Sequence, residues 1–297
     1  MSLARIISSY RQRKSVCLQI MSDLHLEVGQ QYAKFSITPR ANHLVLAGDI
    51  GRLADYEALR DFLSSQCAQF THVYFVLGNH EFFGVSRQEG LRLAERLQQE
   101  PMLEKKLSIM NRKRVNVQDV TILGCTLQSY VPPEAEEIVR TKINDFRRIV
   151  DWTVADHVVE HARDVNWLKD EITSIRTKEA TSKRRIVVIT HHAPSTKGTS
   201  KPSDESNPWS SAFATDLLEG PEKSCLNDVQ WWISGHTHHS AELVRGTVKL
   251  VSNQRGYVLP TKSQPAAQET AMSNKRKPWH ISRQQQETFD PSKAIAI

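Results

Sequence analysis

The sequence predicts an α/β protein in which several parallel strands end at one polar site. Apolar, β-prone segments alternate along the chain with amphipathic helical segments, as in sheets whose strands are connected by helices. Five apolar segments also end abruptly in polar residues, and they cover residues 16–21, 43–47, 73–77, 186–190 and 229–234. Because α/β sheets present functional side chains at the carboxyl ends of their strands, we expect these five polar ends to meet.

The connecting segments carry helix and hairpin signals. Residues 54–70 place apolar side chains on one face and charged side chains on the other, which predicts an amphipathic helix. A second helix is predicted over residues 86–100, beginning at a Ser86 cap and ending before Pro101. Residues 115–126 are predicted to form two short strands around Gln118-Asp119.

The later part of the chain contains two less regular segments. Residues 134–180 are predicted to be helical with a break near Asp151, and they contain none of the polar strings. An insertion between two ligand-bearing strands could carry a substrate cap, because variable connections over a fixed site usually carry specificity. Residues 260–286 are rich in Gln, Ser, Lys and Pro, and we expect an irregular segment there before a closing strand at 294–297. We therefore predict one domain over residues 1–297, with a helical, cap-like insertion at about 134–180.

The five polar strings have the composition of a metal centre. They are Asp23-Leu24-His25, Gly48-Asp49, Gly78-Asn79-His80-Glu81, His191-His192 and Gly235-His236-Thr237-His238. Together they supply carboxylates, imidazoles and a carboxamide, which describes a site for two metal ions. This donor set suits borderline ions such as manganese, zinc or iron rather than soft copper or oxygen-bound calcium. Gly48 and Gly78 allow the sharp backbone turns that such a site needs.

In order and content, these strings resemble the calcineurin-like metallophosphoesterase superfamily. Its pattern reads Asp-x-His, Gly-Asp, Gly-Asn-His-Asp/Glu, a later His and Gly-His-x-His, and every element is present between Asp23 and His238. The resemblance implies a four-layer αββα fold, a two-sheet β-sandwich flanked by helices. It also implies two divalent ions, with manganese expected first and zinc, iron or cobalt as alternatives. Shorter matches to one branch of the superfamily occur at residues 144–149, 167–168, 252–257 and 289–291.

The resemblance also implies a role for each residue of the strings. Asp23, His25 and His238 would bind one ion, Asn79, His191 and His236 the other, and Asp49 would bridge the two. The family pattern favours His191 over the adjacent His192 as the ligand.

His80 is the motif residue that the resemblance does not assign to a metal. In the family this histidine lies near the leaving group, where it can donate a proton or stabilise phosphoryl charge. Its ordinary pKa of about 6.5 suits a general acid near neutrality. The alternative is that His80 only shapes its turn. Elsewhere, His157 and His161 lie one helical turn apart, and the mixed charge around them predicts a solvated face.

Departures from the family pattern indicate the substrate class. Protein Ser/Thr phosphatases of the superfamily continue Gly-Asp with Asp-Arg and flank Gly-Asn-His-Glu with arginines. Here Ile50-Gly51-Arg52-Leu53 follows Asp49, and Leu77 and Phe82-Phe83 flank the second string. The missing phosphate clamp favours a phosphodiesterase for small or nucleotide-like esters, including cyclic nucleotide phosphates, with a phosphomonoesterase as the alternative. Arg147 or Arg148 could restore the charge or could form surface ion pairs.

Composition limits the remaining classes. The net charge of +6 and the pI near 9.1 favour anionic ligands. The basic clusters at residues 112–114, 183–185 and 275–277 are not interleaved with aromatic residues. We read them as solvated loops, so a nuclease is a less favoured alternative, without a recognisable nucleic-acid module. The intact ligand set also argues against a non-catalytic scaffold.

Location and partners follow from similar observations. No apolar run approaches the ~20 residues that cross a membrane, and residues 1–14 lack the apolar stretch of a secretory signal. Four widely spaced cysteines predict a reducing compartment, the cytoplasm or alternatively the nucleus. The expected partner is a small phosphate ester, with no membrane, and the sequence leaves the oligomeric state open.

Overall fold

A computed structural model of the chain describes residues 15–178, 184–219, 223–259 and 289–297. The predictions for residues 1–14 and 260–286 lie outside these ranges, as does the basic cluster at 275–277. The described strands form two sheets.

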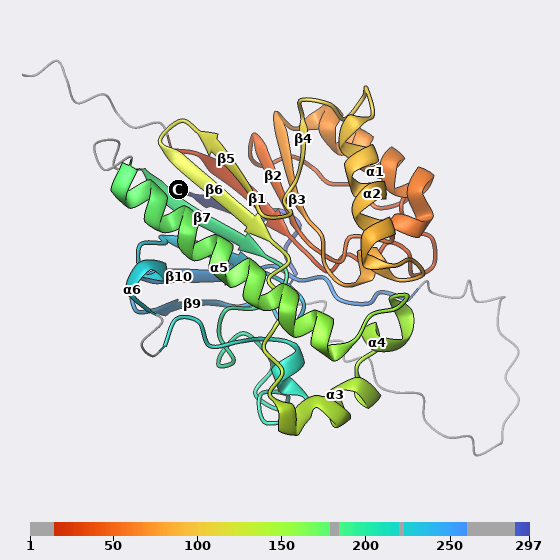
Figure 1. The fold of residues 1–297 in the computed structure, drawn as a ribbon. Helices are drawn as coiled ribbons and strands as arrows, with labels where there is room; N and C mark the ends of the chain where they lie inside the picture. The colour runs from red at the N-terminus through yellow and green to blue at the C-terminus, as the bar shows by residue number, and fades with distance from the viewer. Residues whose placement is uncertain (1–14, 179–183, 220–222, 260–288) are drawn as a thin grey trace, which may run out of the picture.

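The first sheet has the order β11-β1-β2-β3-β4. Its strands are β1 (Cys17–Met21), β2 (His43–Ala47), β3 (His72–Val76), β4 (Leu107–Ile109) and β11 (Ala294–Ala296). The strands β1 to β4 are parallel, and β11 pairs antiparallel with β1. The predicted closing strand is therefore confirmed, and it forms one edge of the sheet (Figure 1).

The second sheet has the order β5-β6-β7-β8-β10-β9. Its strands are β5 (Lys113–Val117), β6 (Val120–Cys125), β7 (Arg185–Thr190), β8 (Trp231–Ser234), β9 (Glu242–Arg245) and β10 (Val248–Ser252). The strands β6, β7, β8 and β10 run parallel, while β5 and β9 are antiparallel to their neighbours. The predicted pair of short strands around Gln118 is confirmed as the β5–β6 hairpin.

Alternating side chains explain why the two sheets pack face to face. In β2, Leu44 and Leu46 belong to the core on the helix side of the sheet, whereas Val45 and Ala47 face the second sheet. In β7, Val187 and Ile189 belong to that same central core. Strands buried on both faces have this near-continuous apolar composition because successive side chains point to opposite faces.

Helices cover both outer faces and complete four layers (Figure 1). The helices α1 (Tyr56–Gln69) and α2 (Arg87–Gln99) cover the first sheet, and α5 (Val154–Lys178) and α6 (Lys223–Leu226) cover the second. The Ser86 side chain accepts a hydrogen bond from the Glu89 amide and caps α2 as predicted. The predicted two-sheet αββα fold is thus confirmed.

The predicted helical stretch at 134–180 divides into parts with different positions. It contains α3 (Glu136–Lys142), α4 (Asp145–Arg148) and α5, with a break where Asp151 has a φ of 55°. Leu168, Ile172 and Ile175 of α5 pack into the outer core of the second sheet, so α5 is a structural layer. The part of the stretch that adjoins the polar site is α3 and α4.

The expectation that His157 and His161 lie on a solvated face of a helix is wrong. Both side chains are buried on α5, because the loop after β6 supplies polar partners. His161 Nδ1 donates to the Leu127 carbonyl at 2.9 Å, and His157 Nε2 accepts from the Ser129 amide at 3.0 Å. Burial lowers the pKa of His157 to about 3, so it is neutral there.

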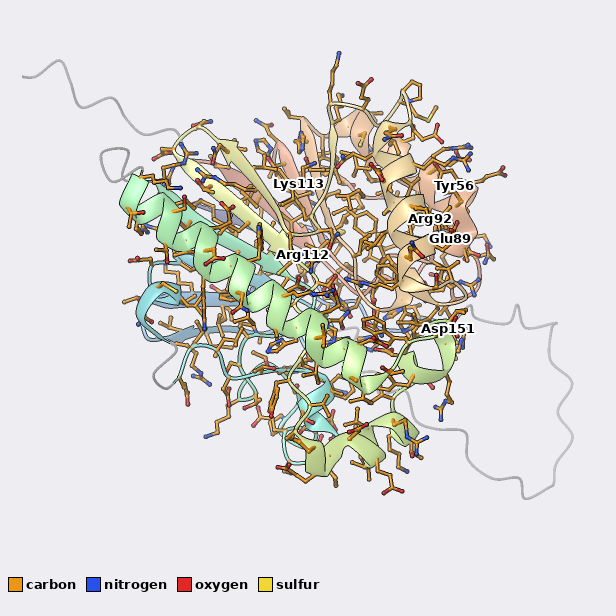
Figure 2. The ribbon with its side chains drawn as sticks, in the orientation of Figure 1. Tyr56, Glu89, Arg92, Arg112, Lys113 and Asp151 are labelled. Atoms are coloured by element: carbon orange, nitrogen blue, oxygen red, sulfur yellow. The ribbon has the colours of Figure 1, made fainter. Side chains whose placement is uncertain are left out.

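The first basic cluster is also tied to α5 and does not form a solvated loop. Arg112 lies beside this helix (Figure 2) and donates to Asp164 Oδ1 at 2.7 Å and to Glu160 Oε2 at 3.1 Å. Lys113 Nζ donates to Gln98 Oε1 at 2.8 Å. These charges therefore stabilise the packing of helices on the sheet edge.

None of the helices in the described part of the chain is long and apolar enough to span a bilayer. All four cysteines are free.

Candidate metal centre

The polar strings from both sheets meet at the carboxyl ends of the parallel strands. In the first sheet, the loop after β1 carries Asp23 and His25, the loop after β2 carries Asp49, and the loop after β3 carries Asn79 and His80. In the second sheet, the loop after β7 carries His191, and the loop after β8 carries His236 and His238. Apart from Asn79 and His80, these side chains form two groups of possible metal ligands that share Asp49. A third group joins His80 to His25 and Glu27. The structure thus brings together every residue of the predicted site.

Unusual backbone conformations turn these side chains inward. Positive φ angles occur at Asp23 (52°), His25 (46°), Asp49 (54°), His236 (72°) and His238 (50°). Non-glycine residues rarely adopt this left-handed region, which costs energy unless the surroundings hold it. Hydrogen bonds between the first two loops provide that support: the Asp23 amide donates to the Gly48 carbonyl and the His25 amide to the Asp49 carbonyl, both at 3.0 Å.

Glu81 organises the loops beneath the site, a role that the sequence analysis did not assign. Its buried carboxylate accepts hydrogen bonds from the amides of Gly78 at 2.6 Å, Ile50 at 2.7 Å and Asp49 at 2.9 Å. A Cβ atom at Gly78 would overlap the Asp49 carboxylate. The close approach of these two loops therefore requires glycine at this position.

The first cluster contains Asp23, His25, Asp49 and His238. His25 Nδ1 lies 3.2 Å from Glu27 Oε1, and because a carboxylate only accepts, this nitrogen carries the proton. His25 Nε2 is then an acceptor, and it lies 2.9 Å from His238 Nε2. His238 Nε2 is in turn 3.5 Å from Asp23 Oδ1. Imidazole nitrogens and a carboxylate that face one another at these distances could hold a cation.

The second cluster contains Asp49, His191 and His236, with Asn79 beside them. His191 Nδ1 lies 2.9 Å from the Ala47 carbonyl, so it is a donor, and Nε2 faces Asn79 Oδ1 at 3.0 Å. The Asn79 amide is oriented by its Nδ2, which donates to Asp145 Oδ1 at 2.8 Å. Asp49 Oδ1 is 3.3 Å from the same His191 nitrogen. His191 Nε2, Asn79 Oδ1 and Asp49 Oδ1 thus converge on one point, where a cation could bind.

The pKa values of the histidines in the two clusters indicate that positive charge is stabilised there. Burial, the largest single effect, lowers the pKa of His191, but Asp49, Asp23 and the Ala47 carbonyl together outweigh it and raise this pKa to about 10. Burial holds the pKa values of His236 and His238 well below the ordinary value, which leaves them neutral. Without an ion His191 is therefore protonated beside Asp49, and a bound cation would take the place of that proton. Carboxylates and the imidazoles in their neutral form bind metal ions, so the residues fit a dinuclear centre.

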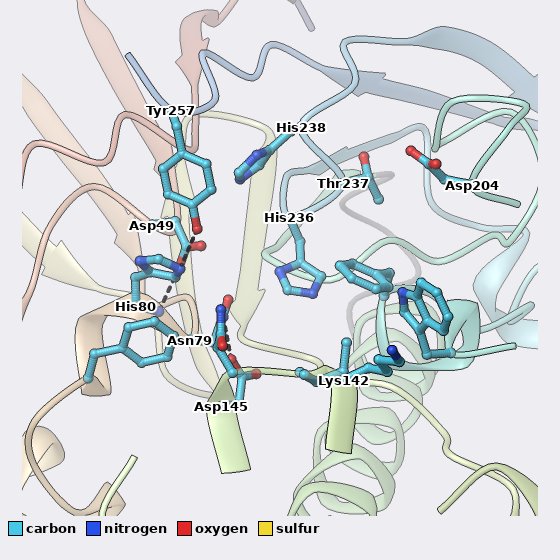
Figure 3. Close-up of a pocket in the computed structure, with 15 residues that line it drawn as sticks. Asp49, Asn79, His80, Lys142, Asp145, Asp204, His236, Thr237, His238 and Tyr257 are labelled. Carbon is cyan, nitrogen blue, oxygen red and sulfur yellow. Dashed lines mark hydrogen bonds between the residues drawn. The ribbon is translucent and has the colours of Figure 1, made fainter. Parts of the chain in front are cut away.

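His80 lies between two partners that are far from it in sequence. Its Nδ1 is 2.8 Å from Glu27 Oε1, and its Nε2 is 3.0 Å from the Tyr257 hydroxyl (Figure 3). Burial would raise the pKa of Glu27, but hydrogen bonds from His25 and His80 lower it to about 2. Burial would lower the pKa of His80, but the negative charges of Asp49 and Glu27 raise it. No role was predicted for Glu27, and Tyr257 appeared only as the last residue of a matching string.

His192 is buried beside the centre but belongs to neither cluster of described residues. Its ring packs on that of His236 with a centroid separation of 4.0 Å. The structure therefore places His191 among the acceptors and His192 behind them.

The two clusters open into a cavity of about 340 Å³. Aromatic and charged residues line it, and among the described lining residues Lys142 is the only lysine or arginine. Arg147 and Arg148 do not line the cavity: Arg147 bonds to the Thr141 carbonyl and to Asn144, and Arg148 lies over the Phe83 ring at 5.1 Å. The two arginines that could have restored a phosphate clamp thus have other partners.

Comparison with known proteins shows which family and which folds this chain resembles. The model of the calcineurin-like phosphoesterase family matches residues 20–240. Uncharacterized protein L509 of Acanthamoeba polyphaga mimivirus is 24% identical over 265 residues, which cover 81% of this chain and 91% of that protein. The crystal structure of phosphopantetheinyl hydrolase from Mycobacterium tuberculosis is similar, with a TM-score of 0.56 and 14% identity over 81% of this chain and 89% of that chain. A provisionally assigned 5′-nucleotidase from Staphylococcus aureus has a TM-score of 0.44 and 15% identity, over 82% of this chain and 48% of that one.

The fold and the clustered ligands define a phosphoesterase, a hydrolase with residues that could bind metal ions. The match over most of its length shows that the chain belongs to the calcineurin-like phosphoesterase family.

Proposed function

We propose that this chain is a phosphodiesterase that uses two divalent transition-metal ions. Manganese is the expected ion, with zinc, iron or cobalt as alternatives. Asp23, His25 and His238 would hold one ion, Asn79, His191 and His236 the other, and Asp49 would contact both. The observation that carries this proposal is the convergence of acceptor atoms in two clusters that share Asp49.

The residues around the clusters support a separate role for each part of the site in hydrolysis. Two bound ions would neutralise phosphoryl charge and lower the pKa of water, so that hydroxide is available near neutral pH. Glu27 holds the Nδ1 proton of His80, which directs Nε2 into the cavity. His80 would then donate a proton from Nε2 to the leaving oxygen, at the place where the Tyr257 hydroxyl now lies 3.0 Å away.

The charge of the cavity supports a diester over a monoester. A dianionic monoester needs fixed positive charge beyond the ions, and a monoanionic diester needs less. Besides the clusters and His80, the charged lining residues are Lys142 and the two acids Asp145 and Asp204. The similar structure from Mycobacterium tuberculosis is that of a phosphopantetheinyl hydrolase, and this is compatible with a phosphate-ester substrate here. The positive charge of Lys142 in this cavity favours the second candidate function, a phosphomonoesterase.

A matched pair of esters tests this choice. The value of kcat/KM is measured for methyl p-nitrophenyl phosphate and for p-nitrophenyl phosphate under saturating Mn²⁺, because this ratio reports differential transition-state stabilisation. We expect the diester to be preferred. A clear preference for the monoester would replace the phosphodiesterase by a phosphomonoesterase with the same site.

We propose a small phosphate ester as the partner and a reducing compartment, the cytoplasm or alternatively the nucleus. The four free cysteines support a reducing compartment.

A nuclease is tested with long RNA and DNA. We expect neither to be hydrolysed, and hydrolysis of either would favour a nuclease.

A further inference from the structure

The cavity has a second wall that the proposed chemistry does not use. This wall, here called the distal wall, consists of Lys142 at the end of α3 and of Trp209 and Phe213 from the segment between β7 and α6. Lys142 lies across the cavity from His80 and Tyr257 (Figure 3). The distal wall therefore faces whatever is attached to a phosphoryl group held at the clusters.

The distal wall is held by a small apolar core of its own. Val131, Val139, Val154 and Ala212 are buried in that core, and Trp209 and Phe213 pack against it. An aromatic side chain supported in this way offers a rigid surface to a ligand at low entropic cost. Trp209 is half-buried and lines the cavity. Lys142 Nζ lies over its ring, so a planar ring can stack on the indole when Lys142 turns toward an anionic group of the ligand.

Lys142 adds a charge that is separate from the metal clusters. Its Nζ lies 5.6 Å from the centre of the Trp209 ring. No carboxylate in the described part of the chain forms an ion pair with it, although Asp204 lines the same cavity. A lysine beside an aromatic surface suits a ligand that combines a planar ring with an anionic group.

We propose that the distal wall binds a nucleotide that carries a second phosphate. In this arrangement the base stacks on Trp209, and the second phosphate pairs with Lys142 while the reacting diester lies at the clusters. The cavity of about 340 Å³ lies in the range of small-ligand sites. This inference rests on the proposed phosphodiesterase function and specifies its substrate class.

Three esters with one leaving group test the inference. They are methyl p-nitrophenyl phosphate, thymidine 5′-(p-nitrophenyl phosphate) and the same thymidine ester with a 3′-phosphate. Because p-nitrophenol leaves in each case, differences in kcat/KM report binding of the other group. For the wild type we expect kcat/KM to increase in this order, mainly through KM.

The variants separate stacking from charge. Trp209→Ala should lower the advantage of both thymidine esters over the methyl ester by about 5- to 100-fold, and Trp209→Phe should restore most of it. Lys142→Met should lower only the added advantage of the 3′-phosphate, by about 10-fold. The matched control is Lys249→Met, because exposed Lys249 lies over Trp231 at 4.9 Å in a similar pair outside the cavity. This control should change none of the three values.

The outcomes distinguish the two proposals. If the methyl ester is hydrolysed and the thymidine group gives no advantage, or if Lys142→Met affects all esters equally, the inference about the distal wall is overturned and the phosphodiesterase stands. If no diester is hydrolysed, the proposed function fails, and calorimetric binding of thymidine 3′,5′-bisphosphate decides the inference. Tighter binding to the wild type than to Lys142→Met would support it, and equal binding would overturn it.

Discussion

Asp145 offers a direct test of how the second cluster is built. Its carboxylate is 3% exposed and accepts a hydrogen bond of 2.8 Å from Asn79 Nδ2. This bond directs Asn79 Oδ1 toward His191 Nε2. Without it the amide can rotate and present its NH₂ group, which cannot bind a metal ion.

The expected loss follows from the role of such supporting groups. Removing a hydrogen-bond partner of a metal ligand typically lowers metal affinity by about 10- to 100-fold, which corresponds to roughly 1.4–2.8 kcal/mol. Asp145→Ala should therefore weaken one of the two Mn²⁺ sites by this amount and leave the other close to its wild-type affinity. Asp145→Asn keeps an acceptor oxygen and should retain most of the affinity.

The measurement is a calorimetric Mn²⁺ titration of the metal-free proteins. Thermal unfolding of the same metal-free samples shows whether each variant is folded. Wild-type affinity at both sites of Asp145→Ala would refute the proposed role of this hydrogen bond. Equal weakening of both sites would indicate a general disturbance instead.

Three further predictions concern the centre itself. Asp49→Asn should abolish hydrolysis while the fold is retained, and elemental analysis should find fewer than the roughly two ions per chain of the wild type; full activity with one ion would contradict the bridging role. His80→Ala should keep both ions and lower kcat by about 10²–10⁴, with a smaller loss for nitrophenyl esters; equal losses for poor and good leaving groups would exclude a proton donor. Gly78→Ala forces a Cβ into the Asp49 carboxylate and should lower the free energy of unfolding in urea by roughly 1–3 kcal/mol, and unchanged stability would show that the loops can move apart.

The part of the fold that could be predicted is the part that local sequence determines. Each strand that ends in a polar string is marked by its own apolar run, and parallel strands bring their carboxyl ends to one edge. The break near Asp151 and the cap at Ser86 are likewise local signals, and both are present. Residues that work through distant partners had no such signal.

The missed residues show this limit. Asp145 and Tyr257 contact the centre across separations of 66 and 177 residues along the chain. Glu27 lies two residues from His25, but it contacts His80 across 53 residues. No periodic pattern connects residues so far apart. His157 was misread for a related reason, because a polar residue on a helix suggests solvent until the loop that accepts or donates its hydrogen bond is known.

The two sheets contribute to both clusters, and this has a consequence for how the protein would acquire metal ions. One cluster combines Asp23, His25 and Asp49 from the first sheet with His238 from the second, and the other joins Asp49 to His191 and His236. A ribosome-bound chain that has emerged only through β4 therefore contains neither complete set of ligands. Ion loading would then follow the docking of the sheets. Ions that bind only the native state stabilise it, by about 2.7 kcal/mol at a hundredfold excess over Kd. Metal supply would thus govern how long the finished protein survives as well as how fast it turns over substrate.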